Sequence, residues 1–235
     1  MAHPHDGCTQ RRGKGEVTVQ RTKPLAGVIL AAGASQRMGR PKAGLRFEGK
    51  TFFARVLEGL TAASLDPIVV VVGAHRAAVT RALGSPYIIV NHDPSRGQLS
   101  SLRLALGHLS APGGTATGVV VALVDHPLVA RSTVAALVQA VQAADQPILV
   151  PNYRGRRGHP VVFMRDVWDE LLATPDRLGA RAVVRRDPRR VCDVPVDDPG
   201  ILVDVDTPAD MEALVTRAAP APSTPRRGAS RRGGG

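Results

Sequence analysis

Short runs of apolar, mostly β-branched residues recur along the chain, and stretches with helical periodicity separate them. Continuous apolar runs of this length are typical of strands that are buried on both faces of a sheet. They predict strands at 26–32, 67–73, 87–91, 118–125, 147–151, 160–163 and 191–196. The run 201–206 alternates between apolar and polar residues, so we expect a strand there with Asp204 and Asp206 on one face.

Between these runs, apolar residues recur three and four positions apart, which is the spacing of one face of an α-helix. This spacing predicts helices that pack against the core at 52–60, 99–109 and 134–141. A fourth helix should begin near Pro208, which suits a first turn. Asp206 or Thr207 can cap that helix, and Asp210 favours its positive end.

Strands that alternate with helices predict an α/β fold, here a single three-layer domain with a mostly parallel sheet covered on both faces. In such sheets, ligands bind outside the carboxyl ends of the strands. Polar or glycine-containing segments follow five of the predicted strands, at 32–42, 73–76, 91–101, 125–127 and 204–208. We therefore expect these five loops to meet at one crevice.

The formal charge of +11 belongs mostly to the two ends of the chain. Residues 1–23 carry five basic and two acidic residues, and 216–235 carry five arginines and no acid, which leaves +3 for 24–215. Because both ends lack apolar periodicity, we expect disordered tails at 1–23 and 218–235 around a domain at 24–217. Only 3% of the residues are aromatic, which argues against a nucleic-acid partner.

The two cysteines, Cys8 and Cys192, are too few for a disulfide framework or a metal cluster, which fits a reducing cytoplasm. We expect Cys192 in the core. The N-terminus is polar, and no apolar run approaches the roughly 20 residues of a membrane span. The sequence therefore predicts a cytoplasmic protein without a membrane partner.

The segment "LAAGASQRMGRPK", residues 30–42, holds more glycine and basic residues than a connecting loop needs. It matches neither G-x-G-x-x-G nor the P-loop, because position 35 is serine and no lysine directly follows the second glycine. Gly33 and Gly39 allow backbone N–H groups to approach a ligand, and Arg37 and Lys42 add positive charge. On these residues alone, a phosphate site and a solvated basic turn remain open.

The same segment resembles, at every signature position, the pattern L-A-A-G-x-S-x-R-M-G-x-P-K of the MobA-like nucleotidyltransferases, which include molybdenum cofactor cytidylyl- and guanylyltransferases. Four further segments are similar to family motifs and follow in order: "NHDPSRGQLSSLRLAL", "LVDHPLV", "GRRGHPVVF" and "VDVDTPADMEAL". The resemblance covers most of residues 25–215. It implies a Rossmann-like α/β domain of the GT-A nucleotidyltransferase type.

The resemblance also implies roles for individual residues. Arg37 and Lys42 would be catalytic and would hold the triphosphate. His159, in the G-H-P segment, would lie near the acceptor. The nucleotide would contact Leu30, Ala31, Ala32, Gly33, Asn91, Gly97, Ser100 and Ser101.

Two aspartates are implied as ligands of Mg²⁺. Asp125 ends a very apolar strand, where an unpaired carboxylate would be costly and a metal would remove that cost. Asp206 is the second implied ligand, although helix capping also explains it and Asp204 could take its place. Ser100 has a structural alternative as well, because a serine near a helix N-terminus often only caps the helix.

The implied reaction moves an NMP group from an NTP to a phosphorylated acceptor and releases pyrophosphate. CTP is the favoured donor, because 41–42, 100–101 and 158–160 look more like the cytidylyl branch. The molybdenum cofactor or molybdopterin is the favoured acceptor, with a molybdenum hydroxylase as the recipient of the product. The alternatives are a nucleotidyltransferase for a sugar 1-phosphate or another small phosphate, and a non-catalytic maturation factor or RNA-binding protein.

Overall fold

The structure is a computed structural model that describes residues 23–33, 35–73 and 87–218. Most of the two expected tails, at 1–22 and 219–235, and residues 74–76 of the second expected loop lie outside the described residues. At the N-terminal boundary, Lys23 donates through Nζ to the carbonyl oxygen of Val141 at 2.9 Å. At the other end, the last described helix ends at Ala218.

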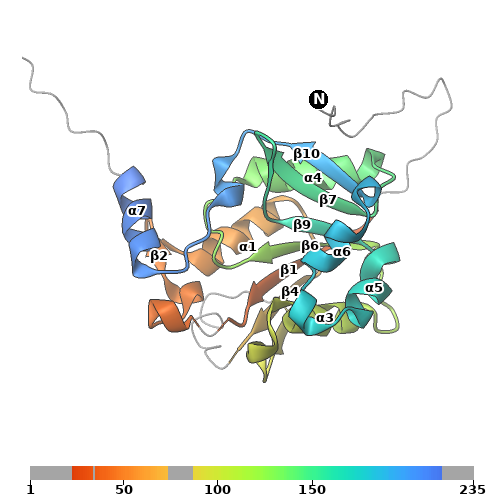
Figure 1. Cartoon of the computed structure of the whole chain (residues 1–235), viewed down its shortest axis with the longest axis horizontal. Helices are drawn as coiled ribbons and strands as arrows, with labels where there is room; N and C mark the ends of the chain where they lie inside the picture. The colour runs from red at the N-terminus through yellow and green to blue at the C-terminus, as the bar shows by residue number, and fades with distance from the viewer. Residues whose placement is uncertain (1–22, 34, 74–86, 219–235) are drawn as a thin grey trace, which may run out of the picture.

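A central sheet organises the described residues, with the strand order β10-β7-β9-β6-β1-β4-β5 and β8 paired to β7 (Figure 1). Strands β5, β4, β1 and β6 are parallel to one another, and β10 is parallel to β7. Strand β9 is antiparallel to both of its neighbours. The expected mostly parallel α/β sheet is therefore confirmed. The strands are β1 (Leu25–Ala31), β4 (Ile68–Val72), β5 (Tyr87–Val90), β6 (Gly118–Leu123), β7 (Ile148–Tyr153), β8 (Arg156–Arg157), β9 (Val161–Met164) and β10 (Val191–Pro195).

The alternating run 201–206 does not form the expected strand. Its first residues lie in a 3₁₀ turn, Pro199–Leu202. The carboxylate of Asp198 starts this turn by accepting from the backbone N–H of Gly200 at 2.8 Å. The chain then passes the end of β6 with a hydrogen bond from the N–H of Val205 to the carbonyl oxygen of Asp125, 2.9 Å long. The alternation reflects a segment with one side packed on the domain, because Ile201 and Val205 are fully buried.

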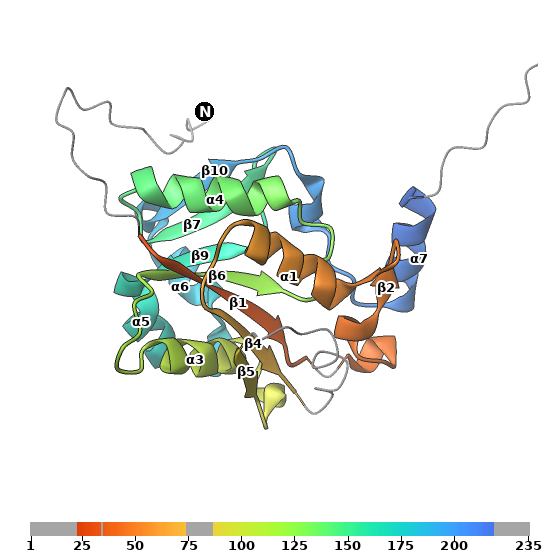
Figure 2. The same ribbon diagram turned by 180° about the vertical axis from the view of Figure 1, so that it is seen from behind.

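Helices cover both faces of the sheet and produce the expected three layers (Figures 1 and 2). Helices α1 and α4 lie on one face, and α3, α5 and α6 lie on the other. Alternate residues of β1 serve the two cores, with Ile29 in the first and Val28 in the second. The helices are α1 (Phe52–Ala62), α3 (Gln98–Leu109), α4 (Arg131–Ala143), α5 (Trp168–Ala173), α6 (Arg181–Arg186) and α7 (Pro208–Ala218).

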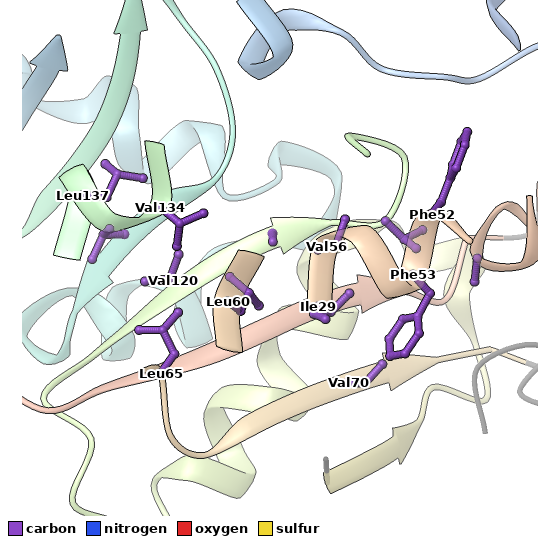
Figure 3. Packing of buried hydrophobic residues seen from close by; sticks show 14 of the residues in the cluster. Ile29, Phe52, Phe53, Val56, Leu60, Leu65, Val70, Val120, Val134 and Leu137 are labelled. Carbon is purple, nitrogen blue, oxygen red and sulfur yellow. The ribbon is translucent and has the colours of Figure 1, made fainter. Parts of the chain in front are cut away.

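The segment that follows the basic loop, residues 30–42, packs through Leu45 and Phe47 on the core on the α1 side. That segment forms a small antiparallel pair, β2 (Arg46–Phe47) and β3 (Lys50–Thr51), before α1 begins. Phe53 and Leu60 of α1 lie in one apolar cluster with Ile29 of β1 (Figure 3). Cys192 is buried in the same cluster, as expected. None of the described helices is both long and apolar enough to cross a membrane.

Candidate active site

A cavity of about 500 Å³ opens beside the carboxyl ends of β1, β4 and β6. It draws residues from each of the five segments that were expected to meet at one crevice, which for 73–76 means Gly73. Most of the residues implied by the family resemblance line it: Leu30, Ala31, Ala32, Gly33, Arg37, Lys42, Gly97, Ser101, Asp125 and Asp206. Three others, Asn91, Ser100 and His159, do not line this cavity.

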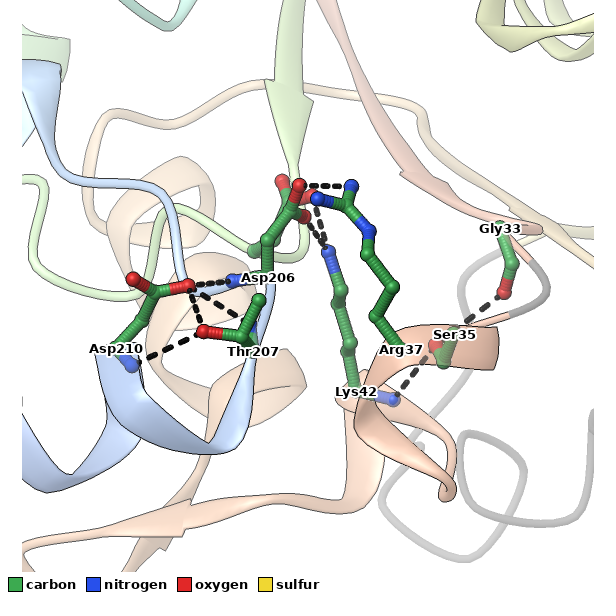
Figure 4. A network of polar contacts seen from close by, with 8 residues as sticks. Gly33, Ser35, Arg37, Lys42, Asp206, Thr207 and Asp210 are labelled. Carbon is green, nitrogen blue, oxygen red and sulfur yellow. Dashed lines mark hydrogen bonds and ion pairs between the residues drawn. The ribbon is translucent and has the colours of Figure 1, made fainter.

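The basic loop is held in shape by one buried apolar side chain and a tight turn. Met38 is buried in the core on the α1 side. Its N–H and that of Gly39 donate to the carbonyl oxygen of Ser35, at 3.0 and 3.1 Å. Gly39 has φ +67°, a conformation that favours glycine. The hydroxyl of Ser35 accepts from the N–H of Lys42 at 3.2 Å (Figure 4). These contacts position Arg37 and Lys42 on the cavity side.

Two cationic and two anionic side chains meet in the cavity. The Nζ of Lys42 lies 2.9 Å from Oδ2 of Asp125 and also donates to Oδ1 of Asp206. Arg37 pairs through Nη2 with Oδ2 of Asp206 at 2.5 Å (Figure 4). Asp125 follows β6, whereas Asp206 precedes α7, so tertiary structure brings the carboxylates to one ammonium group.

Lys42 and Asp206 each shift the pKa of the other so that the charged forms are favoured. Burial lowers the pKa of Lys42, but the hydrogen bond to Asp206 and the charge of Asp125 outweigh burial and leave the pKa raised. The pKa of Asp206 is lowered, chiefly by its hydrogen bond from Lys42. At neutral pH the ammonium is therefore protonated and the Asp206 carboxylate is ionised.

Helix capping is performed by the neighbours of Asp206, which leaves its carboxylate directed at the two cations. The hydroxyl of Thr207 accepts from the N–H of Asp210 at 3.2 Å. In return, Oδ2 of Asp210 accepts from the N–H of Thr207 at 2.7 Å and from that of Asp206 at 3.0 Å. Such reciprocal bonds satisfy the first N–H groups of a helix. Asp204 is exposed and does not line the cavity.

The carboxylates suit a magnesium ion that arrives with phosphate oxygens. Oδ1 of Asp125 is buried and has no hydrogen-bond partner among the described residues. Its Oδ2 and Oδ1 of Asp206 already converge on one cation, Lys42. Within the described ranges, no group of three or more His, Cys, Asp or Glu could hold a metal. Because Mg²⁺ is usually held by one or two carboxylates plus phosphates and water, the residues present fit this ion.

Neutral polar groups lie at the start of α3, beside the cavity. Asn91 is buried and donates through Nδ2 to the hydroxyls of Ser100 and Ser101, at 3.0 and 2.9 Å. Its Oδ1 accepts from the N–H of Asp93 at 2.9 Å. Ser100 in turn donates to the carbonyl oxygen of Gly97 at 2.7 Å. Asn91 and Ser100 thus brace the start of α3, and Ser101 is the member of this group that reaches the cavity.

The MobA-like NTP transferase domain family matches residues 27–191 of the chain. This chain belongs to that family. It is a nucleotidyltransferase of the MobA-like type, and the resemblance seen in its motifs is confirmed. The cavity with its four charged side chains lies at the sheet edge formed by this family's domain.

Curated proteins similar to this chain align with most of its length. The chain is 34% identical over 205 residues to the nicotine blue oxidoreductase of Paenarthrobacter nicotinovorans, covering 81% of this chain and 96% of that one. The chain is 29% identical to a molybdenum cofactor guanylyltransferase of Sinorhizobium fredii, over 72% of this chain and 78% of that one.

Solved structures agree with the fold. The crystal structure of Rv0371c from Mycobacterium tuberculosis matches with a TM-score of 0.71 and 32% identity, over 83% of this chain and 98% of that chain. A complex of the same protein with manganese matches with a TM-score of 0.66 and 29% identity, over 82% and 98%. The Rossmann-like GT-A architecture expected from the sequence is therefore confirmed.

Seven residues that line the cavity were not singled out as site residues from the sequence: Ser35, Pro41, Ala43, Gly73, Pro94, Gln98 and Val124. Four of them lie inside the two longest motif segments, which is the signal that could have identified them. Gly73 follows a predicted strand, and a Cβ there would lie 2.7 Å from the carbonyl oxygen of Ala32. Glycine at this position therefore lets the ends of β1 and β4 approach each other closely.

His159 lies apart from the charged cluster, in a small pocket that it shares with His126. The two rings have centroids 4.9 Å apart. Burial is the main cause that lowers the pKa of both imidazoles, and it brings that of His159 to about 4. Both rings are therefore neutral at pH 7, and a contact between His159 and the acceptor stays a prediction.

Proposed function

We propose that this nucleotidyltransferase moves the CMP group of CTP to the terminal phosphate of molybdopterin or the molybdenum cofactor. The observation that carries the proposal is the position of Lys42 between Asp125 and Asp206, beside a glycine-containing basic loop. Cations suited to a triphosphate and carboxylates suited to a divalent metal share one cavity.

The proposed chemistry depends on position and charge. The attacking oxygen of an acceptor phosphate is already anionic, so it needs no strong base. Arg37 and Lys42 would donate hydrogen bonds to the triphosphate and stabilise the charge that develops on the leaving pyrophosphate. Asp125 and Asp206 would hold Mg²⁺, which would neutralise charge on the phosphates. The part of the cavity that Ser101 lines would receive the nucleoside.

The preference for CTP rests on the resemblance of Pro41-Lys42, Ser100-Ser101 and 158–160 to the cytidylyl branch. Ser101 lines the cavity, whereas Ser100 is engaged by Asn91 and Gly97. The relative from Sinorhizobium fredii is named a guanylyltransferase, which makes GTP the competing donor. A molybdenum hydroxylase that receives the product, and a cytoplasmic location, belong to the same proposal.

A screen of acceptors against the four NTPs, with pyrophosphate release as the readout, tests the proposal. We expect CTP with molybdopterin to give the highest kcat/KM, and Lys42→Ala to lower the rate of pyrophosphate release by about 100-fold. A preference for GTP would assign the chain to the guanylyl branch. A preference for UTP or TTP with a sugar phosphate would indicate sugar activation. Because one relative is named an oxidoreductase, a parallel arm measures NAD(P)H oxidation, where we expect no enzyme-dependent rate.

A further inference from the structure

Lys42 contacts one oxygen of each carboxylate that would hold a metal. Its Nζ lies 2.9 Å from Oδ2 of Asp125 and donates to Oδ1 of Asp206. The Lys42 side chain is only 13% exposed, and those of Asp125 and Asp206 are 17% and 27% exposed. This shielding from water makes the ion pairs stronger than pairs on the open surface. In the structure, the two carboxylates therefore have a cation between them.

The balance of charge in the cavity disfavours a metal ion that arrives alone. Arg37 and Lys42 together balance Asp125 and Asp206. A free divalent ion would add two positive charges and would have to displace the Lys42 ammonium from its partners. The displaced ammonium would then have no anionic partner. A metal–triphosphate complex is different, because its phosphate oxygens offer new partners to both cations.

We infer that Lys42 is an internal counter-ion that excludes free divalent metal, so that the site takes up the metal as a metal–triphosphate complex. On binding, the flexible lysine side chain passes from the two carboxylates to the phosphates and releases the carboxylate oxygens to the metal. The inference rests on the proposed function, because it uses the same carboxylates as metal ligands. It adds that metal affinity is low until the triphosphate is present.

Arg37 provides a matched control because it carries the same charge and contacts one of the same carboxylates. It pairs with the other oxygen of Asp206, Oδ2, at 2.5 Å and does not bridge to Asp125 in the structure. Its side chain is 71% exposed, against 13% for Lys42. Removing Arg37 therefore removes one positive charge from the cavity and leaves the Lys42 bridge in place.

The test measures Mn²⁺ binding to the full chain without nucleotide, by electron paramagnetic resonance of the free ion and by calorimetry. Lys42→Met and Lys42→Gln should each bind Mn²⁺ at least about tenfold more tightly than wild type, because a charge next to both ligands is gone. Arg37→Met should change the affinity by less than about threefold, because water screens an exposed charge. Thermal unfolding verifies that each variant is folded.

Two outcomes would overturn the inference: unchanged or weaker Mn²⁺ binding by both Lys42 variants, or an equal gain in Arg37→Met. A double variant, Lys42→Met with Asp125→Asn, should lose the gain and so locate the ion at the carboxylates. If wild type transfers CMP while the Lys42 variants gain no affinity, only this inference fails. If the affinities change as expected and no NTP is turned over, the proposed function fails instead.

Discussion

Replacing Asp125 by asparagine tests the metal ligand directly, because it preserves the shape of the side chain and removes its charge. In the wild type, Oδ2 accepts from Lys42 at 2.9 Å and Oδ1 is buried without a partner among the described residues. The variant loses one charge-assisted hydrogen bond, and it also removes the cost of a poorly solvated charge. Lys42 keeps its bond to Asp206. We therefore expect a loss of at most about 2 kcal/mol in the free energy of unfolding, or about 8 °C in Tm.

The effect on catalysis should be much larger than the effect on stability. Losing a charged ligand of the metal removes stabilisation of the leaving pyrophosphate, which we expect to lower kcat at least about 100-fold, or roughly 3 kcal/mol of barrier. The assay is pyrophosphate release as a function of Mg²⁺ concentration, with EDTA as a blank. Asp204→Asn is the matched control, because Asp204 is exposed and outside the cavity, and it should retain wild-type kcat. An Asp125→Asn enzyme at the wild-type rate, or wild-type turnover in EDTA, would refute the ligand assignment.

Three further variants probe other parts of the site. Lys42→Ala should lower kcat by about 100-fold, or about 3 kcal/mol of barrier, which is a larger effect than its effect on stability; a wild-type kcat would remove the basic loop from the mechanism. Asn91→Ala removes one hydrogen bond each from the hydroxyls of Ser100 and Ser101 and from the N–H of Asp93, so Tm should fall and the KM for NTP should rise more than kcat falls. An unchanged KM would show that Asn91 does not position the nucleotide pocket. The pKa of His159 is lowered to about 4, so the unfolded chain binds more protons between about pH 4 and 6.5 and stability falls as the pH falls through that window. His159→Gln should flatten this dependence of Tm on pH, and an unaltered slope would contradict the neutral buried ring.

The long helices and strands were predictable because burial against the core alone decides their pattern of apolar residues. Continuous runs such as the one that became β6 are buried on both faces, and helices such as α4 show one apolar stripe. Helices α5 and α6 were missed because each has only six residues, too few to establish a period. The run 201–206 was misassigned because an extended segment with one buried side alternates whether or not it pairs with a strand.

The site was predictable to the extent that its residues lie within motifs, as Lys42 and Asp125 do. The sequence did not show which of these side chains pair with each other, because the pairs join segments that lie far apart in the chain. Lys42 and Asp206 are 164 positions apart and meet only once the sheet is assembled. The buried bonds that Asn91 makes to Ser100 and Ser101 depend in the same way on how α3 packs against the sheet.

If this cavity transfers a nucleotidyl group, the α-phosphate of the NTP must end in the acceptor product. The measurement incubates the enzyme with Mg²⁺, molybdopterin and CTP labelled either at the α- or at the γ-phosphorus, followed by separation of the products. We expect α-label in the acceptor product in a one-to-one ratio with unlabelled pyrophosphate, at a rate about 100-fold lower for Lys42→Ala. We expect γ-label only in pyrophosphate. Transfer of γ-label to the acceptor, or no transfer of α-label when each of the four NTPs is supplied in turn, would show that this cavity does not transfer a nucleotidyl group.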